Sequence, residues 1–115
     1  MTVGSKKADP LPRPAKATDH VVIPATTHAV RGWKDLAATR RSALADAWDL
    51  LTADPTRTSP TMHTLRGDLQ FVAHGGRTHE QWQLELPGGA RIWYYVDDST
   101  VYLVKAHTRH PNQTK

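Results

Sequence analysis

Cysteine is absent from this sequence of 115 residues. Its absence excludes disulfides, thiolate catalysis and every cysteine-ligated zinc site, and it fits a reducing cytoplasm. No uninterrupted apolar run approaches the roughly 20 residues that cross a bilayer, and the N-terminal segment lacks the apolar stretch of a secretory signal. We therefore expect a cytoplasmic protein that does not associate with membranes and in which any metal would need histidine and carboxylate ligands.

Negative charge is also in deficit, since 15 Lys and Arg stand against 11 Asp and Glu and give a formal net charge of +4 at pH 7. A basic surface favours polyanionic partners, which makes nucleic acid the leading candidate. Hydrophobic residues form 38% of the chain, enough for the core of one domain. We place that domain at residues 20–115, after a flexible basic tail at residues 1–19.

The domain is predicted to begin with a short strand and a helix. Residues 21–23 are β-prone, and Pro24 limits them to an edge strand or the end of a strand. Thr26 or Thr27 can cap the helix that follows. The apolar residues of this helix recur at helical spacing and are Val30, Trp33, Leu36 and Ala37.

A second helix is predicted from Arg40 onward, and Pro55 ends it. Its apolar face carries Leu44, Ala47, Trp48 and Leu51. We therefore expect Trp48 in the core. Because the two helices are nearly contiguous, they should form an antiparallel hairpin that packs on a sheet.

Three β-like runs close the domain, at residues 81–86, 90–96 and 101–107. Turn residues separate them, so an antiparallel meander is predicted. The segment 56–76 is rich in threonine, proline and glycine and is expected to be a mainly irregular connection. The fold class is α+β: an N-terminal strand, a two-helix hairpin and a C-terminal antiparallel three-strand meander form one sheet packed on the helices.

Regular alternation along these strands predicts two different sheet faces. One face is apolar and meets the helices; it carries Trp82, Leu84, Leu86, Ile92, Tyr94, Val96, Tyr102, Val104 and Ala106. The other is polar and carries Gln83, Glu85, Arg91, Trp93, Tyr95, Lys105, His107 and Arg109. Cations, aromatic rings and proton-exchanging groups on rigid strands suit an RNA-cleaving surface. An ordinary solvated face with cross-strand charge pairs is the alternative.

Three segments in this order carry a family resemblance: Leu65-Arg66-Gly67, the strand and turn at residues 91–98, and the strand at 100–104 that leads to His107 and Arg109. Over residues 20–110 the chain resembles the RelE/ParE superfamily of toxins from type II toxin–antitoxin systems. The resemblance implies a cognate antitoxin as partner. In the RelE-like branch, which we favour, it also implies an endoribonuclease that cleaves messenger RNA at the ribosome and inhibits translation.

The same resemblance identifies arginines at the positions of Arg91 and Arg109 as functional in RelE-like enzymes. The ParE-like branch instead inhibits DNA gyrase, and a basic nucleic-acid-binding domain without catalysis is a further alternative. Cleavage of messenger RNA by such a fold would need no metal ion and no other cofactor.

Metal-independent cleavage requires a base for the RNA 2′-hydroxyl, cations for the phosphorane and an acid for the departing 5′-oxygen. We assign Glu85 as the base and His107 as the acid, with His110 as its substitute. Arg91 and Arg109 form the phosphate clamp. RNA-binding roles are assigned to Arg66, Gln83, Trp93, Tyr95 and Lys105, with Trp93 or Tyr95 stacking on a base.

Overall fold

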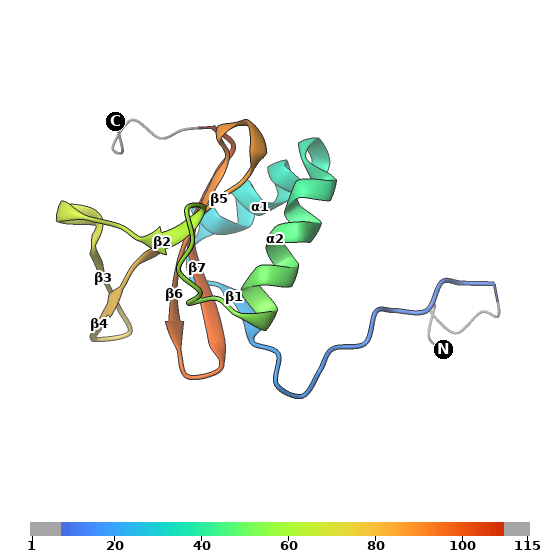
Figure 1. Ribbon diagram of the computed structural model, residues 1–115, viewed down its shortest axis with the longest axis horizontal. Coiled ribbons are helices and arrows are strands. Elements are labelled where there is room, and N and C mark those ends of the chain that lie inside the picture. Colours follow the sequence, from blue (N-terminus) through green and yellow to red (C-terminus); the bar gives the residue numbers. More distant parts are fainter. Residues whose placement is uncertain (1–7, 110–115) are drawn as a thin grey trace.

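Two helices pack on one face of a five-stranded mixed sheet in the computed structural model, which describes residues 8–109 (Figure 1). The predicted α+β class and the predicted element order are confirmed. The helices are α1 (Thr27–Thr39) and α2 (Arg41–Ala53). The strands are β1 (Val21–Pro24), β2 (Met62–Thr64), β3 (Phe71–His74), β4 (Arg77–Glu80), β5 (Trp82–Glu85), β6 (Arg91–Asp97) and β7 (Thr100–His107).

Helix α1 starts at a cap that the sequence predicted, because the Thr26 side chain accepts a hydrogen bond from the Ala29 amide at 3.0 Å. Only Arg40 separates α1 from α2. The buried residues of α1 are Ala29, Gly32 and Leu36, whereas Val30 and Ala37 of the expected apolar stripe are exposed. The buried stripe therefore lies about one residue away from the predicted one.

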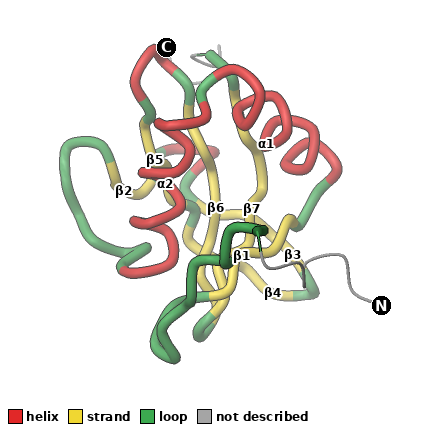
Figure 2. The backbone as a smooth tube through the Cα atoms, turned by 90° about the vertical axis from the view of Figure 1, so that its right-hand side faces the viewer, coloured by secondary structure: helices red, strands yellow, loops and turns green. Residues whose placement is uncertain are grey.

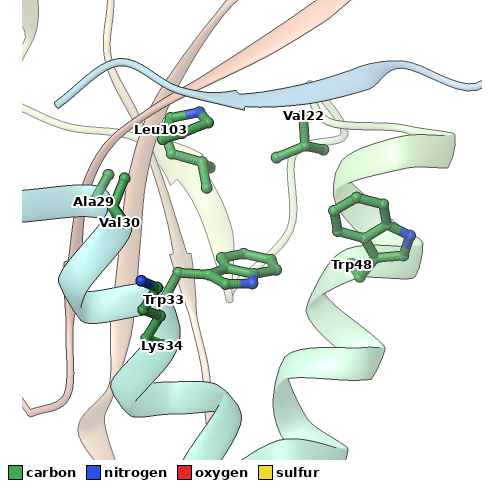
Figure 3. A pocket seen from close by; sticks show the side chains of 8 residues that line it. Val22, Ala29, Val30, Trp33, Lys34, Trp48 and Leu103 are labelled. Atoms are coloured by element: carbon green, nitrogen blue, oxygen red, sulfur yellow. The ribbon is translucent and has the colours of Figure 1, made fainter. Parts of the chain in front are cut away.

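Trp48 of α2 is 42% exposed, so its predicted place in the core is wrong. Leu44, Ala47 and Leu51 supply the buried face of α2. The Trp48 ring instead makes an edge-to-face contact with Trp33 of α1, with 5.9 Å between the ring centroids. Figure 3 shows the two indoles facing each other between the helices below β1.

The strand order of the large sheet is β1-β7-β6-β5-β2. The meander β5-β6-β7 is antiparallel as predicted, and β1 adds to its edge by pairing in parallel with β7. The segment 56–76, predicted to be a mainly irregular connection, is irregular only in part. It contributes β2, whose buried Met62 pairs opposite Leu84, and β3, which forms a separate hairpin with β4.

A β-bulge in β7 changes which residues face the helices. Trp93 pairs with Lys105 but Tyr94 pairs with Leu103, so Val104 is the extra residue. The bulge reverses the alternation for the residues before it. Val101 and Leu103 therefore join the core, and the predicted placement of Tyr102 and Val104 on the apolar face is wrong.

The core lies between the helices and one face of the sheet, and the β3–β4 hairpin lies on the other side (Figures 1 and 2). Tyr94 fixes the end of α2 to this core because its hydroxyl donates a hydrogen bond of 2.6 Å to the Pro55 carbonyl. Burial raises the pKa of this hydroxyl. Within residues 8–109, neither helix has the length and apolar character needed to span a bilayer.

Candidate functional site

The sheet face opposite the helices, called the second face below, presents its side chains in three cross-strand rows. Register across β5, β6 and β7 defines the charged row, Glu85, Arg91 and His107. The same register defines the middle row, Gln83, Trp93 and Lys105. Beyond the bulge, Tyr95 and Tyr102 form the tyrosine row. The expected side of the sheet is thus correct for all seven predicted residues of these strands.

An ion pair holds the first half of the charged row. The Arg91 guanidinium donates a short hydrogen bond from Nη1 to Oε1 of Glu85. The Arg91 side chain is only 13% exposed and that of Glu85 is 34% exposed, so the pair is partly shielded from solvent. Arg91 Nε is buried without a hydrogen-bond partner among the described residues. The carboxylate thus orients a guanidinium that retains unused donors.

His107 ends the charged row as a neutral imidazole. Burial, followed by the charges of His28, Lys105 and Arg91, lowers the pKa of His107 from 6.5 to about 4. Its Nε2 atom is buried and has no hydrogen-bond partner within residues 8–109. At neutral pH this ring is therefore uncharged. The lowered pKa works against the acid role that the sequence assigned to His107.

Trp93 lies at the centre of the middle row and is only 1% exposed. Its Nε1 donates a hydrogen bond of 2.9 Å to Gln83 Oε1, and the Lys105 ammonium lies 5.6 Å from the ring centroid. The His107 ring meets it edge-on, with 4.5 Å between centroids. The expected exposure of Trp93 is wrong, because these contacts make it the floor of the site and leave no open ring face for a base.

The β3–β4 hairpin covers the tyrosine row. His79 stacks on Tyr95 with a centroid separation of 4.1 Å, and Tyr95 stacks on Tyr102 at 5.0 Å. The Tyr95 hydroxyl also forms a hydrogen bond of 2.5 Å with His74 Nδ1. Tyr95 is 2% exposed, so its ring also offers no open surface for base stacking. The charged row lies at the opposite end of the second face from this hairpin.

The remaining predicted residues are dispersed. Arg109 is exposed and follows the end of β7 by two residues, which keeps it near His107 in the chain. His110 lies outside the described residues. Arg66 is exposed beside the start of β5, since the preceding Leu65 amide bonds to the Gln81 carbonyl. Arg66 is therefore at the other end of that strand from Glu85.

One neighbour of His107 had no signal in the sequence. His28, in the first turn of α1, places its ring 5.4 Å from the His107 ring at an interplanar angle of 61°. The two residues are 79 positions apart, so only the packing of α1 on β7 brings them together. His28 is exposed, and it extends the charged row beyond the edge of the sheet.

An apolar pocket on the helical side of the sheet is less suited to chemistry (Figure 3). Lys34 is its one charged lining residue; the others are Val22, Pro24, Ala29, Val30, Trp33, Trp48 and Leu103. Across residues 8–109, no three His, Asp or Glu side chains are grouped so as to hold a metal ion. The charged row therefore remains the best candidate site.

Comparison with protein-family models and with curated protein sequences finds no match. Among solved structures, the fold is similar to that of a copper-bound mutant toxin from Helicobacter pylori. The TM-score is 0.55 at 13% identity, and the match covers 76% of this chain and 92% of the toxin chain. The likeness supports a toxin-like fold.

Proposed function

We propose that this protein is the toxin of a type II toxin–antitoxin system of the RelE-like kind and that it cleaves messenger RNA at the charged row. One arrangement carries the proposal. Arg91 and Lys105 place positive charge beside the neutral imidazole of His107, whose Nε2 has no partner within the described part of the chain. The fold likeness to a solved toxin supports the toxin role in this proposal.

In the proposed reaction the His107 imidazole takes the proton of the RNA 2′-hydroxyl, and the 2′-oxygen attacks the adjacent phosphorus. The unused donors of Arg91 and the Lys105 ammonium stabilise the charge that builds on the phosphate oxygens. Glu85 would have to leave Arg91 to act as a base. We therefore move the base from Glu85 to His107 and make Glu85 the residue that positions Arg91.

The test is cleavage of a ribosome-bound message by purified protein, followed by mapping of the RNA ends. Attack by the 2′-oxygen should leave a 2′,3′-cyclic phosphate and a 5′-hydroxyl. Arg91→Gln should slow single-turnover cleavage by about 10²–10³-fold, the usual loss when one charge-stabilising donor is removed. Arg57→Gln is the matched control, because Arg57 is exposed in the loop after α2, and it should cleave at the wild-type rate.

Arg91→Gln also leaves the partly buried Glu85 carboxylate without its ion-pair partner. The variant could therefore lose activity by misfolding rather than by losing a catalytic group. The double variant Glu85→Gln/Arg91→Gln replaces the ion pair by two amides, so it should fold and still be slow. Thermal unfolding verifies that it is folded. Full activity of the folded double variant would overturn the site. Inhibition of gyrase supercoiling without RNA cleavage by the wild type would favour the ParE-like alternative.

The proposed partner is a cognate antitoxin that masks the second face around the charged row. An acidic or extended segment would complement the positive charges of Arg91, Lys105 and the exposed Arg109. Hydrogen exchange in the complex should show new protection in β6 and β7. Protection confined to the outer surface of α1 and α2 would contradict direct masking of the site.

A further inference from the structure

The position of His28 is fixed by contacts between the start of α1 and the bulge in β7. Thr26 Oγ1 donates a hydrogen bond of 2.5 Å to the carbonyl of Val104, the bulged residue, while it caps α1. One helical turn beyond His28, Gly32 lies so close to β7 that a Cβ there would overlap the Ala106 carbonyl. The first turn of α1 is therefore held at a defined place beside His107.

The edge of the sheet leaves room for this contact. Within residues 8–109, β1 pairs with residues 100–103 of β7 alone, so the last residues of β7 have no strand neighbour on that side in this part of the chain. The exposed ring of His28 lies 5.4 Å from the half-buried ring of His107. The two imidazole rings are thus in edge-on contact at the end of the charged row, where Arg91 is the cross-strand partner of His107.

From this geometry we infer that His28 is the general acid of the RNA cleavage proposed above, on which this inference rests, and that His107 is its base. His107 takes the proton from the 2′-hydroxyl, the 2′-oxygen bonds to phosphorus, and the bond from phosphorus to the 5′-oxygen breaks. His28, acting as the acid, gives a proton to that oxygen. The products are a 2′,3′-cyclic phosphate and a 5′-hydroxyl, and the proton on His107 returns to His28 through water.

The surroundings of the two rings set this direction of proton transfer. His107 meets Arg91 from β6, Lys105 on its own strand and His28 from α1, while Glu85 of β5 is occupied by Arg91. Burial and these charges hold the His107 imidazole neutral. His28 is exposed, so its ring is open to a substrate that approaches from solvent.

Two RNA substrates of the same sequence test the assignment, one with a normal phosphodiester and one with sulfur in place of the bridging 5′-oxygen. A thiolate leaves without protonation, so the sulfur substrate needs no acid. His28→Gln should slow cleavage of the oxygen substrate by about 10²–10⁴-fold and cleave the sulfur substrate near the wild-type rate. His107→Gln should be slow on both. His63→Gln, on β2 three strands from β7, is the matched control and should behave as wild type.

Each other outcome is decisive. A His28→Gln protein with the wild-type rate on the oxygen substrate overturns the inference, and so does one that is equally slow on both substrates. Rescue of His107→Gln by sulfur would reverse the two roles and overturn it as well. A wild-type protein that cleaves neither substrate would instead refute the proposed function. Because His28 is exposed, its variant is expected to fold, which thermal unfolding verifies.

Discussion

His107 shows how a few neighbours change the chemistry of one residue. In the sequence it is one of seven histidines, with nothing to mark its protonation state. In the structure it ends a strand between Trp93 and His28, with Lys105 and Arg91 nearby. A group whose pKa falls on folding is linked to stability, because the folded chain then binds fewer protons than the unfolded chain.

We predict that His107 destabilises the protein as the solution becomes acidic. Above pH 6.5 the ring is neutral in both states and contributes nothing. As the pH falls from 6.5 to about 4, the unfolded chain takes up a proton that the folded chain excludes, so the free energy of unfolding decreases. The loss should reach about 1–2 kcal/mol once solvent screening at this half-buried ring is allowed for.

Urea unfolding at pH 7 and pH 4.5 measures the effect, with His107→Gln as the comparison because glutamine does not titrate. The variant should lose less stability than the wild type between the two pH values. Equal losses in the two proteins would show that the folded ring binds its proton as readily as the unfolded one.

At the scale of single elements, α1 depends on a close approach to β7. Gly32 is the residue of α1 that permits it, since its missing Cβ would fall on the Ala106 carbonyl. Glycine inside a helix is otherwise unfavourable by roughly 1 kcal/mol relative to alanine. From the sequence alone, Gly32 lowers the helix propensity of α1. In the structure, the close packing of α1 on β7 requires a residue without a Cβ at this position.

Gly32→Ala should therefore destabilise the protein by about 2–3 kcal/mol or more, although helix propensity alone would favour the alanine. The steric overlap must be relieved by moving α1 away from β7, which also separates His28 from His107. Chemical denaturation gives the change in the free energy of unfolding. Ala37→Gly, at an exposed position of the same helix, should cost only about 1 kcal/mol. A gain in stability for Gly32→Ala would contradict the close packing.

Two residues of α2 give a second contrast. Trp48 is 42% exposed and Leu51 is fully buried. Trp48→Ala removes an edge-to-face contact with Trp33 and should cost about 1 kcal/mol, whereas Leu51→Ala leaves a cavity and should cost about 2–5 kcal/mol. Measured unfolding free energies in the opposite order would restore Trp48 to the core position that helical spacing predicts.

For the molecule as a whole, the β3–β4 hairpin differs from the rest of the sheet. β3 and β4 pair only with each other within the described chain, and most of their residues are exposed. Ring contacts to Tyr95 and an exposed pair between Arg77 and Asp97, at 3.6 Å, hold them to the second face. Such an exposed pair contributes less than about 1 kcal/mol, so the rings supply most of the attachment.

We expect this hairpin to open without unfolding of the main sheet. Native-state hydrogen exchange should be at least about tenfold faster at residues 71–80 than in β6 and β7. His79→Ala should accelerate exchange in the hairpin further, because it removes the stack on Tyr95, and leave β1 and β7 unchanged. Uniform protection across both sheets would show that the hairpin belongs to a single cooperative unit.

Residues 8–19 of the N-terminal tail make few polar contacts with the rest of the domain. Within the described part of residues 1–19, Arg13 contacts Asp49 of α2 at 2.6 Å, but both side chains are largely exposed. Exposed ion pairs of this kind add little stability. We therefore propose that residues 20–115 form the folding unit and that the preceding residues contribute charge.

Local sequence patterns determined the helices, the strands and one face of the sheet. Helical spacing located α1 and α2, Thr26 was an identifiable cap, and alternation placed Glu85, Arg91 and Lys105 on one sheet face. These features depend on residues a few positions apart, so they are legible in the sequence. The bulge in β7 could not be predicted in this way, because Tyr102, Val104 and Ala106 alternate regularly in the sequence and only the strand pairing shows the extra residue.

Only the tertiary structure decided which of those residues meet. Trp48 is exposed because the packing of α1 and α2 leaves it over the pocket, and Trp93 is buried because Gln83, Lys105 and His107 surround it. The contact between His28 and His107 joins the first helix to the last strand. Burial and contact between residues depend on how segments distant in the sequence pack together. A pattern of residues a few positions apart does not determine that packing.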